Sequence, residues 1–593
     1  MNPPTPAEEE RPLPRLPDPT APAGQDRVID EAADGASALS ELEGTGDVGP
    51  DGAGRPDGEP QPDGAARSGR LRSSAIVGIG TGLSRVTGLV QTMALIYTLQ
   101  FTNLSDAYIL ANVTPNLIYE LVLGGVLSAT LIPVFVERHE IGDDQAIDTV
   151  VSFITVVLVG LTIVAVVAAP WIFHIFTLDV DSQKAAALAS VGVPLVRLFA
   201  PQIFFYGLTA VGTALLNSRR RFAAPAFAPV LNNIVLVTIL LEVHHLAGGV
   251  PSAGQVLADR TLLLLLGLGT TAGIAAMTVV LWPAIRRAGI RLRPRLDWHE
   301  PALRTVARLS GWTLGYVIAN QIAFMTVAAL AYGSGEGNAT RYSYAFMFFQ
   351  LPHGLLAVSI MTTYLPGLAA LASRHDMAGF RDRFTEGGRV LFVLVLPAAV
   401  GLALLAQPLM AAMFSILHFR NAGPVTAEII TAFALGLPAF SLYLYVLRAF
   451  YALKDTRTPF FLNVIENSVN IGLAFAFVGA LSIQGLALAY AAAYTVGAIA
   501  AFILLRRRVG PLWSAAVARS AGSAIAAAAV MGVVVWAVSS SVGSATGSGA
   551  LVRCVAGVLA GGVVYFGMLM LLRSEDVDGL TRRLRRRTTP AVR

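Results

Sequence analysis

Long apolar segments constrain this chain more than any other feature of its sequence. From Ser73 onward, stretches of about 20 or more mostly apolar residues follow one another, each long enough to cross a bilayer as a helix. Only 14% of the residues are charged, against about 25% in an ordinary soluble domain. We predict an all-α polytopic membrane protein with fourteen transmembrane helices: 74–99, 105–136, 148–176, 186–216, 222–246, 261–285, 304–333, 341–372, 386–417, 427–453, 459–480, 485–506, 514–539 and 550–572.

The two ends of the chain have a different composition. Residues 1–72 are rich in Pro, Gly, Ala and acidic side chains, so they cannot bury enough apolar surface to offset the entropy of ordering. We predict a disordered cytoplasmic tail, either without a specific partner or as a docking segment for a cytosolic or cell-division partner. Residues 574–593 form a basic cytoplasmic tail suited to anionic headgroups.

Arginine is distributed unevenly between alternate loops. The loops Phe101–Leu104, Gly333–Thr340, Ala480–Gln484 and Ser540–Gly549 carry almost no positive charge. The other loops carry clusters at 219–221, 286–295, 374–383, 454–457, 506–508 and 582–587. Because positive loops stay in the cytoplasm, we expect both termini to be cytoplasmic.

The sequence contains an internal repeat. Pro225 and Asn233 have the same spacing as Pro459 and Asn467, offset by 234 residues. This offset covers six spans, an even number, so the two halves are parallel repeats facing a central cavity near the membrane midplane. We predict an N-lobe at 73–290, a C-lobe at 300–508 and two additional helices at 509–573. This organisation favours a transporter over a membrane enzyme.

Several charged residues lie where lipid-facing sequence would carry none. Arg85 falls near the middle of the first span, where snorkelling to the interface is difficult, so we expect it either to bind an anion in the cavity or to pair with Asp106 or Glu120. Asp106 has a simpler alternative as an acid at a helix start. Arg197, in the fourth span, either reaches the cavity or packs against carbonyls.

The eleventh span carries Asn463, Glu466, Asn467 and Asn470 on one helical face. A carboxylate among amides suits a hard monovalent cation or a proton, whereas hydrogen bonding between helices is the alternative. No spacing of His, Asp, Glu or Cys resembles a zinc or magnesium site, and no Walker-type loop is present, so we expect no bound metal cofactor and no direct use of ATP.

Five short runs together resemble a known family signature: Ser84–Val90, Asp106–Tyr108, Pro115–Leu117, Gly125–Ala129 and Pro133–Phe135. The resemblance is to the MurJ/MviN lipid II flippases of the multidrug/oligosaccharidyl-lipid/polysaccharide exporter superfamily, bacterial plasma membrane proteins. It implies a cationic cavity for the pyrophosphate and head of lipid II, and a groove at 509–573 for the polyprenyl tail. The substrate-binding set that we predict is Arg85, Asp106, Asn112, Asn116, Glu120 and Arg197.

The chain departs from the family pattern at three arginines, which fall at Gln91, Tyr119 and Met347. These departures leave the fold expectation intact and affect the substrate. The resemblance also implies a sodium site, and we predict an ion-coupling set, for Na⁺ or H⁺, of Asn320, Asn463, Glu466, Asn467 and Thr495.

Three functions follow as expectations. The first is a lipid II flippase that works by alternating access, and the second is an exporter of lipid-linked polysaccharide or drugs from the same superfamily. The third is a non-transporting scaffold that recruits cell-wall enzymes. We expect no enzymatic activity, because no paired catalytic constellation appears in the sequence.

Overall fold

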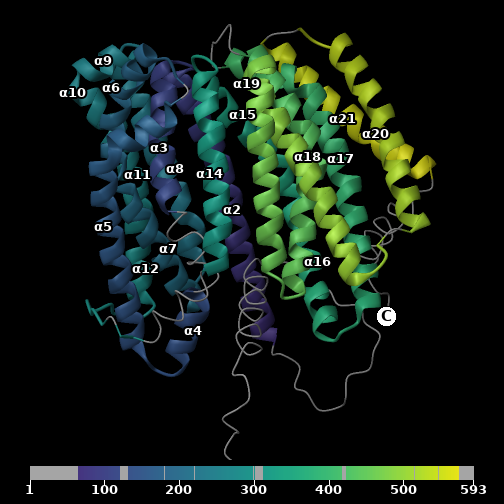
Figure 1. Cartoon of the computed structure of the whole chain (residues 1–593), viewed down its shortest axis with the longest axis horizontal. Helices are drawn as coiled ribbons and strands as arrows, with labels where there is room; N and C mark the ends of the chain where they lie inside the picture. Colours follow the sequence, from purple (N-terminus) through teal and green to yellow (C-terminus); the bar gives the residue numbers. More distant parts are fainter. Residues whose placement is uncertain are drawn as a thin grey trace, which may run out of the picture.

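The computed structural model describes residues 64–119, 131–178, 180–219, 221–297, 299–300, 311–416, 423–512, 514–544 and 547–572. The regular elements of these ranges are all helices (Figure 1). Glu120, the tail up to residue 63 and the tail from residue 573 lie outside the described residues.

The first half of the chain forms one group of helices, which we call the N-lobe. Its elements are α2 (Gly64–Leu99), α3 (Asn103–Tyr119), α4 (Ile132–Glu140), α5 (Asp144–Phe176), α6 (Ser182–Phe199), α7 (Gln202–Ser218), α8 (Ala223–Leu246), α9 (Ala253–Ala258), α10 (Arg260–Leu264), the π-helix η3 (Leu265–Gly269), α11 (Thr270–Val279) and α12 (Leu281–Arg287).

The second half forms the C-lobe and two further helices. Its elements are α14 (Gly311–Gly333), α15 (Asn338–Pro352), the π-helix η4 (His353–Ala357), α16 (Val358–Ser373), α17 (Met377–Ile416), α18 (Gly423–Ala452) and α19 (Arg457–Val509). The last two helices, α20 (Ala515–Ser541) and α21 (Ser548–Leu571), pack against each other and against α17.

Eleven helices of the described ranges are long and apolar enough to cross a membrane. One of them, α19, has a non-helical residue at Ser482 (φ 50°), so it contains two of the predicted spans joined within the predicted loop 480–484. The eighth predicted span continues from α15 through the π turn η4 into α16. The multi-pass helical architecture is confirmed, and the count of fourteen spans stays a prediction.

The two lobes lie side by side in Figure 1. The N-lobe helix α2 and the C-lobe helix α14 lie where the two lobes meet. Within the N-lobe, α2 packs mainly along α8, and within the C-lobe α14 packs mainly along α19. This matching arrangement is what a parallel repeat of six spans produces. The helix that carries Arg85, α2, and the helix that carries Asn320, α14, therefore occupy equivalent places at the centre of the molecule.

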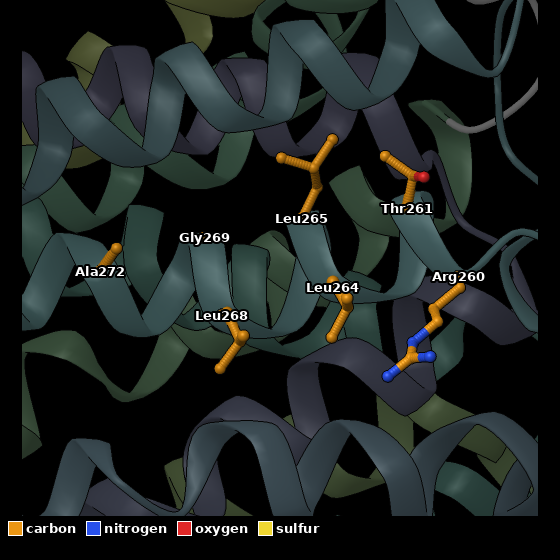
Figure 2. A pocket seen from close by; sticks show the side chains of 7 residues that line it. All are labelled: Arg260, Thr261, Leu264, Leu265, Leu268, Gly269 and Ala272. Carbon is orange, nitrogen blue, oxygen red and sulfur yellow. The ribbon is translucent and has the colours of Figure 1, made fainter.

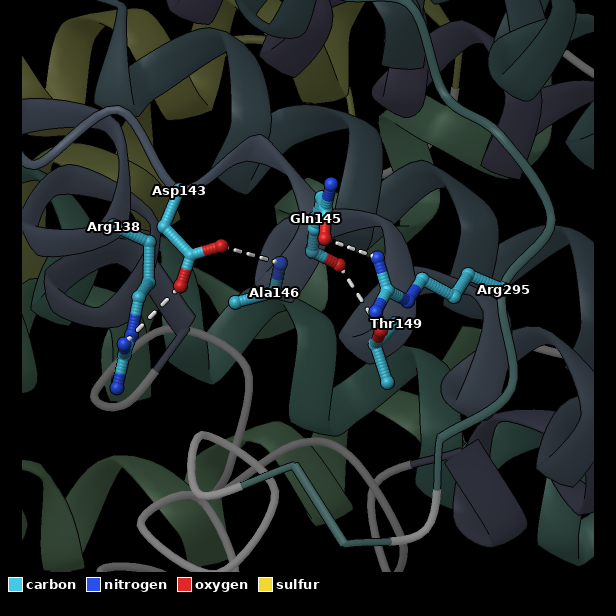
Figure 3. Close-up of polar contacts among 6 residues, drawn as sticks. All are labelled: Arg138, Asp143, Gln145, Ala146, Thr149 and Arg295. Atoms are coloured by element: carbon cyan, nitrogen blue, oxygen red, sulfur yellow. Dashed lines mark hydrogen bonds and ion pairs between the residues drawn. The ribbon is translucent and has the colours of Figure 1, made fainter.

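Polar contacts fix the start of α5 (Figure 3). The Asp143 carboxylate accepts a hydrogen bond from the Ala146 amide at 3.1 Å, capping the helix, and pairs with Arg138 at 3.3 Å. The Arg295 side chain donates to Gln145 of the same helix, and the Arg295 amide donates to Ser152 at 2.9 Å. The segment that leaves the N-lobe after α12 is thus held against α5.

The packing of α18 on α19 predicts a specific sensitivity at Gly436. A Cβ there would lie 2.6 Å from Cα and 2.7 Å from Cβ of Ala491, so Gly436→Val forces two helix backbones apart. Overpacking of this kind costs about 1–3 kcal/mol, and we expect thermal unfolding in detergent to shift down by roughly 1–3 °C. Gly472→Ala on α19 is the control, because its Cβ would meet no atom within 4 Å. Equal Tm values for the two variants would contradict the close contact.

Candidate functional site

Asp106 joins the two lobes at one end of the bundle. Its buried carboxylate accepts hydrogen bonds from the Gly337 amide (2.7 Å), the Thr340 amide (3.0 Å) and the Thr340 hydroxyl (2.7 Å). These amides belong to the first turn of α15, so Asp106 lies in the first turn of α3 while capping a helix of the other lobe. The aspartate therefore satisfies orphan amides at a positive helix end.

Further contacts close the same end of the bundle. We call it the arginine-poor end, because the loops at 100–102 and 334–337, which lie there, carry no arginine. The Ser105 and Thr340 hydroxyls are 3.0 Å apart, and the Tyr332 hydroxyl donates to the Asp106 carbonyl at 3.1 Å. The Phe101 ring packs edge-on against Tyr344. These contacts exclude a direct path for a large solute between the lobes at this end.

Arg85 lies on α2, fourteen residues before the helix ends at Leu99 and hence about 21 Å from that end at 1.5 Å per residue. Its side chain is exposed and has no hydrogen-bond or ion-pair partner in the described part of the chain. It nevertheless faces the other lobe, because a Cβ on Gly354 of η4 would lie 3.4 Å from its Nη1 atom. The expected pairing with Asp106 does not form, since that carboxylate is bound to α15.

The turn of α2 that carries Arg85 is attached to α8. The Asn233 amide donates to the Ser84 carbonyl at 3.2 Å and to the Thr87 hydroxyl at 2.9 Å. The neighbouring Asn232 amide donates to Asn233 Oδ1 at 3.4 Å. Sequence reasoning noted Asn233 only as a member of the repeat, not as a contact of the Arg85 turn.

The other predicted substrate residues are dispersed. Asn112 and Asn116 are half-buried on α3. Arg197 is exposed in the last turn of α6, a helix that packs on α3, α5 and η3. Gln91 and Met347, where the family carries arginines, lie on the central helices α2 and α15, and Thr92 contacts Met347 at 3.2 Å. Among the described residues of the predicted substrate set, Arg85 is the cation that belongs to one lobe and approaches the other, at Gly354.

The eleventh span forms a polar cluster with α14. The amides of Asn463 and Asn467 both donate to Asn320 Oδ1 at 3.2 Å, so the structure brings these three predicted residues together. Glu466 is fully buried beside them, and neither of its carboxylate oxygens has a hydrogen-bond partner in the described part of the chain. The Oδ1 atoms of Asn463 and Asn470 lack partners in the same way. Buried oxygens without donors are costly unless a cation or proton joins them.

The sodium ligands implied by the family resemblance fit only in part. Thr495 is exposed and its hydroxyl donates to the Ala491 carbonyl of its own helix at 2.7 Å, and Asn320 Oδ1 already accepts two hydrogen bonds. The free acceptors are instead the oxygens of Asn463, Glu466 and Asn470, at spacings of three and four residues along one helical face. Oxygen donors are the ligand type that hard cations take.

Glycine provides the space beside Glu466. A Cβ on Gly497, in the second half of α19, would lie 3.3 Å from both the Glu466 Cγ atom and the Tyr443 ring. Sequence reasoning missed Gly497 and Tyr443, because a glycine and an aromatic residue inside apolar helices carry no distinguishing pattern.

A separate pocket of about 490 Å³ lies along α10, η3 and α11 in the N-lobe (Figure 2). Six of its seven lining residues are leucine, glycine, alanine or threonine, and Arg260 is its charged member. None of the predicted site residues lines it, so this pocket is distinct from the interlobe site.

Comparison with known proteins decides the family. The family model described as "Lipid II flippase MurJ" matches residues 96–557, which is most of the chain. The chain belongs to the MurJ family. A probable lipid II flippase MurJ of Rhizobium tropici is 30% identical over 533 residues, covering 87% of this chain and 97% of the relative. A lipid II flippase MurJ of Burkholderia cenocepacia is 26% identical, covering 76% and 87%.

Solved structures share the MurJ fold. A lipid II flippase MurJ in an inward closed conformation aligns with a TM-score of 0.67 at 20% identity, covering 84% of this chain and 99% of that chain. An inward-facing multidrug resistance MATE family transporter of the MOP superfamily aligns at 0.59 and 15% identity, covering 72% and 95%. The superfamily fold expected from the sequence is confirmed.

The Ser105–Thr340 contact predicts a reversible lock between the lobes. In a Cys554→Ser background, Ser105→Cys with Thr340→Cys is expected to form a disulfide under mild oxidation, because the two hydroxyls are 3.0 Å apart. Adding Asp106→Ala removes the acceptor for the Gly337 and Thr340 amides, and the crosslinking rate should fall severalfold. Gel mobility with and without reductant measures both effects.

The control pair is Ser105→Cys with Ser359→Cys, which places the second cysteine on the exposed face of α16. It should remain uncrosslinked under the same oxidation. Equal crosslinking of the two pairs would show that Ser105 and Thr340 do not form the specific contact described above.

Proposed function

We propose that this chain moves a lipid-linked pyrophosphate carrying a sugar-peptide head, of the lipid II type, from the inner to the outer leaflet of a bacterial plasma membrane. Membership of the MurJ family, whose relatives are named lipid II flippases, supports this substrate. The observation that carries the proposal is Arg85, an exposed guanidinium halfway along a central helix and against the other lobe. A guanidinium binds a pyrophosphate bidentately.

The transport cycle that we propose is alternating access. With both termini cytoplasmic, as the loop arginines favour, the arginine-poor end is the outer one. Asp106 and Thr340 then hold the outer end closed while the lipid head enters from the cytoplasmic side. The outer end opens when this cap separates, and α20 and α21 accommodate the polyprenyl tail beside α17.

Coupling to a cation gradient or to the membrane potential is the second part of the proposal. Asn463, Glu466 and Asn470 provide the unpartnered oxygens for Na⁺ or H⁺, while Asn320 and Asn467 hold α14 against α19. A bound cation neutralises the buried Glu466 carboxylate. Because the cluster joins the two halves of α19 to α14, its occupancy affects the packing of the whole C-lobe.

A lipid-linked glycan remains the second candidate substrate, because Gln91, Tyr119 and Met347 reduce the positive charge that the family pattern would provide. Binding of lipid II and of an undecaprenyl-pyrophosphate glycan to the purified chain separates the two. We expect lipid II to bind at least tenfold more tightly. Tighter binding of the glycan than of lipid II would make the glycan the proposed substrate and leave the transport mechanism unchanged.

Arg85→Ala should weaken lipid II binding by roughly 10- to 100-fold, the equivalent of one charge-assisted contact. Arg85→Lys keeps the charge without the bidentate geometry, so its Kd for lipid II should lie between those of the unmutated chain and Arg85→Ala. Fluorescence titration in nanodiscs measures the Kd, and complementation in flippase-depleted cells measures transport. Arg507→Ala, an exposed arginine at the end of α19, is the matched control and should bind normally. An unchanged Kd for Arg85→Ala would remove Arg85 from the site.

Glu466→Gln should abolish cation-dependent stabilisation. For the unmutated chain we expect Tm to rise by about 2 °C on adding NaCl in place of choline chloride, or on lowering the pH, since a ligand at 100 times its Kd contributes about 2.7 kcal/mol. A response to NaCl indicates that Na⁺ binds the cluster, and a response to pH indicates that H⁺ does. Glu428→Gln on α18, an exposed glutamate, is the control. A cation response that survives Glu466→Gln would place the coupling site elsewhere.

A further inference from the structure

The part of α2 around Arg85 is poorly fixed by apolar packing. Large side chains there are exposed, with Leu83 at 42%, Val86 at 61% and Val90 at 48%, whereas the stretch from Ala94 to Leu99 is mostly buried. Apolar burial therefore sets the position of the last turns of α2 but contributes little to its rotation near Arg85. Another interaction must decide which way the guanidinium faces.

Two contacts with α8 supply that interaction. Gly80 approaches α8 so closely that a Cβ would lie 2.9 Å from the Ala226 side chain, which fixes the distance between the helices. Gly88, about one turn after Arg85 along α2, leaves room for the Asn233 amide. A Cβ on Gly88 would lie 3.6 Å from the Asn233 Nδ2 atom. Asn233 then bonds to groups on both sides of Arg85 in sequence, the Ser84 carbonyl and the Thr87 hydroxyl.

The neighbouring asparagine orients the Asn233 amide. Asn232 donates to Asn233 Oδ1, which leaves the Asn233 NH₂ group directed at α2. Asn232 is itself confined, because a Cβ on Gly273 of α11 would lie 2.6 Å from its Oδ1 atom. A chain of contacts thus runs from α11 through the asparagine pair to the Arg85 turn.

We propose that Asn233 is the positioning residue for Arg85: its amide fixes the rotation of α2 so that the guanidinium faces η4 and the pyrophosphate. Asn233 acts through Arg85 and does not touch the substrate. This inference rests on the proposed function, because it assigns Arg85 the pyrophosphate of a polyprenyl lipid. The variant series should rank Asn above both Asp and Ala, because neither replacement can donate to the Ser84 carbonyl and the Thr87 hydroxyl as the amide does.

A double-mutant cycle tests the proposal. The Kd for undecaprenyl pyrophosphate and for lipid II is measured in nanodiscs for the unmutated chain, Asn233→Ala, Arg85→Ala and the double variant. We expect Asn233→Ala to weaken binding about five- to twentyfold alone and less than twofold in the Arg85→Ala background. Equal losses in both backgrounds would reduce Asn233 to a structural contact, and no loss alone would overturn the proposal. Asn217→Ala on α7 is the control.

A second measurement is independent of the lipid. Spin labels at Val86→Cys on α2 and Leu355→Cys on η4, in a Cys554→Ser background, report the orientation of α2 relative to the C-lobe, and both sites are exposed. Asn233→Ala should broaden or shift the distance distribution, and Asn217→Ala should not. An unchanged distribution overturns the positioning role. If the distribution changes but neither lipid binds the unmutated chain, the proposed function fails and the positioning role stands. Asn233→Asp serves both tests if Asn233→Ala does not fold.

Discussion

The cap that Asp106 places on α15 is the interaction on which the arrangement of the two lobes depends. A carboxylate at a helix N-terminus completes amides that the helix cannot satisfy itself, and here the acid and the helix belong to different lobes. Each charge-assisted bond contributes about 1.5–3 kcal/mol net, and separating them leaves a buried charge and orphan amides. The closed end is therefore a discrete state. Opening it requires water or new hydrogen-bond partners for both the Asp106 carboxylate and the amides of α15.

The internal repeat places asparagine at equivalent points with different consequences. Asn233 attaches α8 to α2 beside Arg85, and Asn467, 234 residues later, attaches α19 to α14 through Asn320. In the N-lobe the amide bonds to backbone and a hydroxyl, which leaves the arginine free. In the C-lobe the amides bond to each other and leave Glu466 without a donor. One inherited contact thus supports an exposed cation in one lobe and a buried acid in the other.

The sequence was sufficient for the multi-pass helical architecture because hydropathy is a local property. The side-by-side placement of Asn463 and Asn467 followed from helical spacing, and Asn320 joins them as the family resemblance implied. The partners of Asp106 could not be foreseen, since two of the three are backbone amides, 231 and 234 residues away, and backbone groups leave no trace in a sequence. Thr495 was placed by alignment alone, and its exposed orientation depends on a helical register that the alignment did not determine.

The single-residue turn at Ser482 has a mechanical consequence. The two spans of α19 are joined without a loop, through one residue at φ 50°, and a Cβ on Gly485 would lie 2.5 Å from the Phe477 carbonyl oxygen. A hairpin this tight cannot hinge at its apex, so its arms tilt together. Any displacement that begins at the Glu466 cluster on one arm is carried to the other arm, whose end at Arg506–Arg508 lies beside the start of the first arm, where Arg508 pairs with Asp455.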